Sequence, residues 1–207
     1  MPGRFLLPVL PLLVAGCLKL TVPPPTVQSY RLEYEPPAVA AEPLDVVVRV
    51  APFGVNSVYD RESIVYREDE HRIGTYFRHR WIANPAAMVS DLLARDLAAS
   101  GVYRTVQKGL LVANDYDLSA EIEEIGEVVG NPSEARLRIT AMLVKTSGRP
   151  ERRIVLRKSY SAAEPVADDG GSALVASMSR AMARISTELQ KDIHAAIRAA
   201  EERERNR

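Results

Sequence analysis

The sequence predicts an α+β domain in which a mainly antiparallel sheet carries two principal helices packed on one face. Three observations predict it. Strands that alternate apolar and polar residues occur early in the chain and again over 116–161, a capped amphipathic helix lies between the two groups, and a long amphipathic helix follows them. The chain has 207 residues, 46% of them hydrophobic, which suffices for one packed domain over residues 28–200.

The early strands are indicated by alternation and by β-branched residues. Segment 29–34 alternates aromatic or aliphatic residues with charged ones, and 44–50 is rich in valine. Segments 63–66 and 72–81 flank the charged stretch 67–71. They predict a hairpin whose second strand carries several aromatic residues.

The first helix has clear signals at both ends. Asn84 can cap the free amides, Pro85 suits the first helical position, and Gly101 is placed to end the helix. We therefore predict a helix from Pro85 to about Ser100. Its apolar stripe is expected to face the sheet, with three charged residues away from the centre of that stripe: Asp91, Arg95 and Asp96.

The second half predicts an antiparallel meander followed by a helix. A strand begins near Tyr116, and the pair Glu123-Glu124 breaks its alternation, which predicts a bulge. Turns at 130–133 and 147–150 lead to further strands. The remaining segments are a strand over 135–143, a strand over 153–161, a helix over 171–200, and a charged tail over 201–207 that we expect to be frayed and solvated.

The first 16 residues are predicted to be an export signal. Arg4 precedes an apolar stretch over 5–15, and small residues follow it. That stretch is far shorter than the roughly 20 residues that cross a bilayer as a helix. Pro8 and Pro11 interrupt it further, so we expect a cleaved signal rather than a retained anchor.

Cys17, the one cysteine of the chain, ends the sequence Val14-Ala15-Gly16-Cys17, which resembles the lipobox of bacterial lipoproteins. The resemblance implies a covalent diacylglycerol and an N-acyl lipid on Cys17, and no other cofactor is expected. Two further interpretations are an ordinary signal peptide with an incidental cysteine and a buried core cysteine. Residues 17–27 would form a Pro-rich tether, and Leu18 and Lys19 favour the outer membrane of a Gram-negative bacterium.

Composition and motifs give no support for an enzyme. Lysine plus arginine equals aspartate plus glutamate at 27 each, which argues against nucleic-acid binding. The histidines His71, His79 and His194 lack metal-ligand spacing, so no metal is expected. The stretch 168–171 is glycine-rich but lacks a phosphate-binding motif, and it predicts a loop before the last helix.

Two clusters have a functional and a structural interpretation. Glu121, Glu123, Glu124 and Glu127 could form an acid–base pair or a cation site, but a solvated face or bulge is favoured, with Glu121 and Glu123 pointing to solvent together. The sequence from Arg78 to Trp81 could contact lipid head groups or nucleic acid, but an ordinary strand with a buried tryptophan is favoured.

The chain resembles the ABC-type transport auxiliary lipoprotein family, which includes the paraquat-inducible lipoprotein that accompanies transporters with mammalian-cell-entry (MCE) domains. The resemblance spans nearly all of the mature chain. It rests on Cys17, on Tyr30-Arg31-Leu32, on Ile64-Val65-Tyr66, and on the stretch from Tyr76 through Trp81 to Asn84-Pro85. The familiar double proline before the helix is Asn84-Pro85 here, and no tryptophan follows the last helix.

The resemblance implies a non-enzymatic component of an envelope lipid-transport system. Its partners would be an MCE protein and the associated ABC transporter, and its lipid would anchor it to a membrane. Identical subunits would assemble into a ring that docks the lipid-transport passage at the outer membrane. Two alternatives are an outer-membrane assembly lipoprotein and an anchored hydrolase that uses Glu or His residues. Clustered aromatic residues make Tyr76 and Trp81 our candidate partner contacts.

Overall fold

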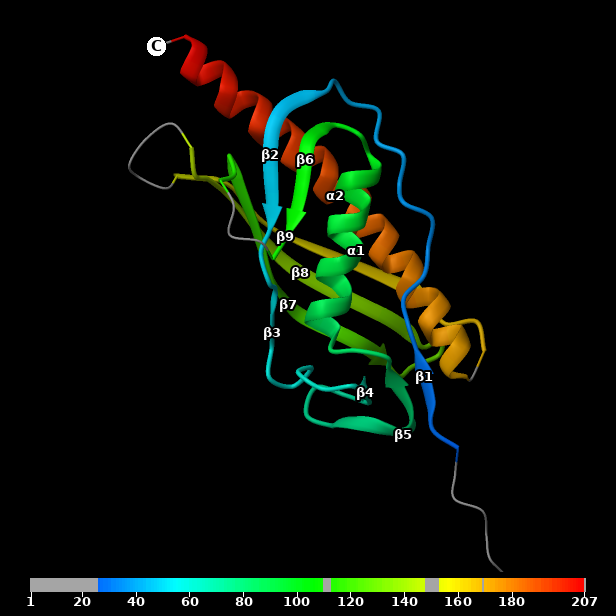
Figure 1. The fold of residues 1–207 in the computed structure, drawn as a ribbon. Coiled ribbons are helices and arrows are strands. Elements are labelled where there is room, and N and C mark those ends of the chain that lie inside the picture. Colours follow the sequence, from blue (N-terminus) through cyan, green and yellow to red (C-terminus); the bar gives the residue numbers. More distant parts are fainter. Residues whose placement is uncertain (1–25, 110–112, 148–152, 169, 207) are drawn as a thin grey trace, which may run out of the picture.

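The structure is a computed structural model that describes residues 26–109, 113–147, 153–168 and 170–206. Figure 1 shows a sheet with both helices on one face, and its long ladders are antiparallel, which confirms the predicted α+β class. The elements are β1 (Gln28–Tyr30), β2 (Leu44–Val50), β3 (Gly54–Val55), β4 (Ser63–Arg67), β5 (Ile73–Trp81), α1 (Pro85–Ala99), β6 (Tyr103–Lys108), β7 (Tyr116–Val128), β8 (Glu134–Lys145), β9 (Arg153–Pro165) and α2 (Gly171–Arg205).

Strand β7 lies at the centre of the sheet. One of its edges pairs with β8 along the whole strand, and β8 pairs in turn with β9, both antiparallel. The β7–β8 register shifts between Ile122 and Glu124. The predicted meander and its bulge are therefore confirmed.

The other edge of β7 pairs with three short strands in succession, all parallel to it. Val48 of β2 pairs with Tyr116, Gly54 of β3 with Glu121, and Val65 of β4 with Gly126. Strand β6 extends the sheet beyond β2, again in parallel. None of these parallel pairs was predicted, and neither were β3 and β6, because a parallel partner lies far along the chain and leaves no turn signal between the strands.

The predicted hairpin is present as β4 and β5, and β1 adds a short parallel pair beyond β5. The predicted strand 29–34 was too long, since β1 ends at Tyr30. Beyond it, Leu32 is buried, and the backbone amide of Glu33 donates to Ser179 Oγ of α2 at 3.1 Å. The chain leaves the sheet after Tyr30 because the residues that follow pack against the helices.

Helix α1 begins and ends where its signals place it. Asn84 Oδ1 accepts a hydrogen bond from the Ala86 amide at 2.9 Å, and Gly101 has a φ of +64°. Asp96, however, is fully buried rather than away from the core. It accepts hydrogen bonds from the Tyr34 hydroxyl and from Ser186 Oγ, both at 2.6 Å, and so links α1 to α2 and to the segment after β1.

Helix α2 runs past its predicted end to Arg205. The expected frayed tail was wrong, because Glu201 and Glu204 of this last turn both bind a buried lysine of the sheet. Among the residues that the structure describes, no helix is long and apolar enough to cross a membrane. The predicted export signal, Cys17, the prolines of the tether and most of the turn 147–150 lie outside the described residues.

Candidate interaction surface

Trp81 lies at the end of β5 and belongs to the hydrophobic core. It is 2% exposed, and its backbone amide donates to the Glu62 carbonyl at 2.6 Å. The interpretation of a strand with a buried tryptophan is correct. The choice of Trp81 as an exposed partner contact is wrong, because its ring has no surface to offer.

Tyr76 is half-buried and held by three neighbours. Its hydroxyl donates to Glu127 Oε2 at 2.5 Å, and its ring centroid lies 4.8 Å from that of Tyr66 and 5.5 Å from that of His79. These contacts fix the side chain against the helix-facing side of the sheet. Tyr76 as a partner contact stays a prediction.

A cavity of about 290 Å³ lies beside Tyr76, between the sheet and the start of α2. Its polar side chains include His79 and Glu127. Gly171, the first residue of α2, closes it, and a Cβ there would lie 2.5 Å from the Tyr30 hydroxyl and 2.7 Å from His79 Nδ1. Glycine is therefore needed for the helix to approach the sheet this closely. The remaining lining residues are Val129, Ser133, Val166, Gly170 and Leu174.

Exposed apolar side chains gather at the same end of the sheet. Phe77 is 72% exposed, because β5 bulges there: its register with β4 jumps from Arg80–Ser63 to Thr75–Val65. Six large hydrophobic side chains are exposed among the described residues, and five lie on or beside β1, β5 and the end of β7. We call these five the β5-end surface: Val27, Ile73, Phe77, Ile82 and Val129.

Sequence reasoning did not single out Phe77. A signal was present, since Tyr76 and Phe77 are consecutive aromatic residues on one strand. Successive side chains of a strand point to opposite faces, so one of the two had to turn away from the helices. Which one did so was decided by the bulge.

The bulge in β7 divides the acidic cluster. Glu121 is exposed and Glu123 is half-buried against Thr140 Oγ1, as a largely solvated face requires. Glu124 departs from that expectation: it is 8% exposed and pairs with Arg67 and with Arg138, the latter at 3.3 Å. Glu127 lies on the helix-facing side with Tyr76. The structure therefore does not bring the four carboxylates together.

The three histidines lie apart. His71 is exposed in the β4–β5 turn, His79 lines the cavity 3.2 Å from the Tyr30 hydroxyl, and His194 Nε2 lies 3.0 Å from the Glu42 carbonyl. No group of three histidine, cysteine, aspartate or glutamate residues lies close enough to hold a metal ion within the described ranges.

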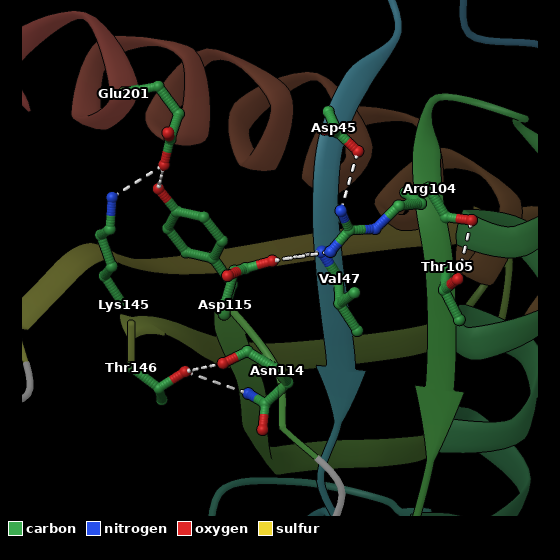
Figure 2. A network of polar contacts seen from close by, with 10 residues as sticks. Asp45, Val47, Arg104, Thr105, Asn114, Asp115, Lys145, Thr146 and Glu201 are labelled. Atoms are coloured by element: carbon green, nitrogen blue, oxygen red, sulfur yellow. Dashed lines mark hydrogen bonds and ion pairs between the residues drawn. The ribbon is translucent and has the colours of Figure 1, made fainter. Parts of the chain in front are cut away.

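The opposite end of the sheet carries a polar network that ties the last turn of α2 to the strands. Lys145 is 5% exposed, and its Nζ donates to Glu201 at 2.8 Å and to Glu204 at 2.7 Å. Figure 2 shows Lys145 and Glu201 facing each other, and nearby Asp115 accepting from the Val47 amide at 2.8 Å. In the same view, Arg104 of β6 donates to Asp45 of β2 at 3.0 Å, and Thr146 bonds Asn114.

The charges of this network support one another. Burial opposes the charge on Lys145, but the hydrogen bonds to Glu201 and Glu204 outweigh it and raise the pKa of Lys145. Burial likewise opposes the charge on Glu201, but hydrogen bonds from Lys145 and Tyr116 lower the pKa of Glu201. Burial and the bond to Glu201 raise the pKa of the Tyr116 hydroxyl. The network therefore holds Lys145 and Glu201 in their charged forms.

Solved structures share this fold. A crystal structure of a protein from Xanthomonas campestris matches with a TM-score of 0.77 at 18% identity, covering 84% of this chain and 99% of that one. A hypothetical protein from Chlamydia trachomatis matches with a TM-score of 0.55 at 10% identity, covering 75% of this chain and 99% of that one. At these identities the likeness concerns the fold alone. No curated protein matches the chain.

Fold and surface together define a small α+β domain with ion pairs buried at one end and an apolar surface at the other. The sequence profile of the family described as "ABC-type transport auxiliary lipoprotein component" matches residues 30–190. The chain belongs to this family, as its motifs indicated. The match begins at Tyr30, the last residue of β1, and ends within α2, so it includes strands β2 to β9, helix α1 and the first part of α2.

Proposed function

We propose that the protein is a lipid-anchored periplasmic component of an ABC/MCE-type envelope lipid-transport system, and that it docks the transport passage at the outer membrane. The observation that carries the proposal is family membership over residues 30–190, because the family is described as an auxiliary lipoprotein of ABC-type transport. In this proposal Cys17 carries the lipid, and an MCE protein with its ABC transporter is the partner.

The proposal includes a non-enzymatic role, and the state of the buried charges supports it. Asp117 pairs with Arg49 at 2.6 Å, Glu124 with two arginines, and Lys145 with two glutamates. Each pair joins two elements of the fold. Groups held in such pairs serve poorly as acids or bases for a substrate, whereas they suit a rigid adaptor.

Self-association into a ring is also part of the proposal. Within the described residues, β6 pairs with β2 alone and β9 with β8 alone, so each leaves one strand edge available to another chain. Charged side chains lie along both edges, including Arg104 and Lys108 on β6 and Lys158 on β9. Copies would therefore meet through specific polar contacts rather than through open strand pairing.

A pull-down from the native envelope tests the proposal. The full chain with a C-terminal tag is extracted in mild detergent, and the retained proteins are identified by mass spectrometry and sized. We expect an MCE protein together with several copies of this chain. The Cys17→Ser variant is the matched control, and it should lose the lipid mass and its membrane retention.

Two results would contradict the proposal. A lone monomer with no envelope partner would remove both the docking role and the ring. A stable complex with an unrelated outer-membrane protein, formed without any MCE protein, would favour the assembly lipoprotein instead.

A further inference from the structure

We propose that the β5-end surface rests on the bilayer, so that the folded domain itself makes a second membrane contact beside the lipid on Cys17. The inference deepens the proposed function and rests on its lipid anchor. In this inference the exposed apolar patch contacts a membrane surface rather than a protein.

The patch lies where the chain leads back to the anchor. Val27 directly precedes β1, whose Gln28 pairs with His79 of β5, so the tether joins the domain beside Phe77. Figure 1 shows β1, the first described strand, beside β5 and far from the C-terminal end of α2. The ten Cα–Cα steps from Cys17 to Val27 span at most about 35 Å, which keeps this end of the domain close to the bilayer.

The large exposed fractions of these apolar side chains are unusual for a surface that contacts only water. Phe77 is 72% exposed, Ile82 62%, and Ile73 49%. Single exposed apolar residues are common, but five at one end of a domain mark an interaction surface. A tethered domain needs little intrinsic affinity for the bilayer, because the anchor keeps the surface at a high effective concentration.

Basic residues accompany the apolar ones, as a phospholipid surface requires. Arg78 and Arg80 follow Phe77 on β5 and are exposed, and neither pairs with a carboxylate among the described residues. In the adjoining turn Glu68 and Asp69 both pair with Arg72, at 3.0 and 2.7 Å, but Glu70 is exposed as well, so the turn keeps a net negative charge and the basic part of the surface is limited to Arg78 and Arg80. Unpaired arginines next to an exposed phenylalanine match the composition of interfacial membrane-binding segments.

Bromolipid quenching of an introduced tryptophan tests the contact. The native Trp81 is buried and gives a constant background. The lipidated full chain carrying Phe77→Trp is reconstituted into vesicles of phosphatidylethanolamine with a minority of phosphatidylglycerol, containing acyl chains brominated near the head group. The matched control is Ile154→Trp, because Ile154 is 56% exposed but lies on β9, away from the patch.

We expect the Phe77→Trp protein to lose most of its added emission and the Ile154→Trp protein to keep it. Apolar side chains of interfacial segments enter the boundary by about 5–10 Å, which places them beside such bromines. Equal quenching in the two variants would overturn the inference. An unquenched Phe77→Trp protein would overturn it as well. If the Phe77→Trp protein is unquenched and a pull-down with the Phe77→Ser protein also loses the MCE protein, the patch contacts a protein partner instead.

Flotation of the same vesicles separates this inference from the proposed function. A chain that does not float with lipid lacks the anchor, and both proposals then fail. A chain that floats, shows no selective quenching and still recovers the MCE protein refutes the second contact and leaves the docking role intact.

Discussion

Replacing Lys145 with methionine should destabilise the domain by about 2 kcal/mol. The ammonium makes two charge-assisted hydrogen bonds, at 2.8 and 2.7 Å, and each such bond contributes roughly 1.5–3 kcal/mol. Glu201 and Glu204 are 36% and 35% exposed, so water compensates a part of the loss. Methionine keeps the apolar stem of lysine, which limits any packing change to the polar head.

Urea unfolding followed by circular dichroism measures the stability change, and hydrogen exchange reports on the helix end. The amides of residues 201–205 should exchange faster in the variant, because the last turn of α2 loses its contact with β8. Lys158→Met is the matched control: Lys158 also bonds a carboxylate of α2, Asp192, at 2.7 Å, but it is 50% exposed.

The control should lose distinctly less stability, because surface ion pairs contribute little. Equal losses in the two variants, with unchanged exchange at residues 201–205, would refute the reasoning.

The pH dependence gives a second check. The pKa of Glu201 is lowered in the folded state, so its contribution is fully present above the ordinary glutamate pKa of about 4.3 and is lost as the pH falls through the folded value. The difference between wild type and Lys145→Met should therefore shrink in acid.

Four further substitutions test other parts of the fold, each by urea unfolding. Asn84→Ala should cost about 0.5–2 kcal/mol, because the Ala86 amide loses its cap. Gly126→Ala should cost about 1–3 kcal/mol, because its Cβ would lie 2.5 Å from the Val65 carbonyl oxygen; an unchanged midpoint would show that the strands can separate. Trp81→Ala should cost about 3–5 kcal/mol, whereas Phe77→Ser should change stability by less than about 0.5 kcal/mol. Similar losses for the latter two would contradict the assigned burial.

Elements with local signals could be predicted from the sequence. Helix α1 required only the cap at Asn84, the proline after it and the glycine at 101, and these act within a single turn of backbone. The meander was equally accessible, since alternation sets the faces of its strands and two charged residues in a row mark its bulge. Family membership followed from the same stretches, because they carry the motifs.

Contacts between distant segments were decided by the tertiary structure. Alternation predicted a strand from 29 to 34, but pairing with β5 stops at Tyr30 and the helices take over the side chains beyond it. The charged residues at 201–205 suggested a solvated tail until Lys145, about 56 positions earlier, supplied a buried partner. No local pattern contains such a partner.

The sequence by itself determined the fold class, both helices, the meander and the position of the lone cysteine. Helix caps, strand alternation and turn residues act over a few positions, so they can be read without coordinates. The tertiary structure alone decided that Phe77 is exposed and that the four glutamates of β7 are separated. Those outcomes depend on bulges and on parallel strand pairs, which bring together residues far apart in the chain. Whether a side chain is buried is decided only when these distant segments have packed together.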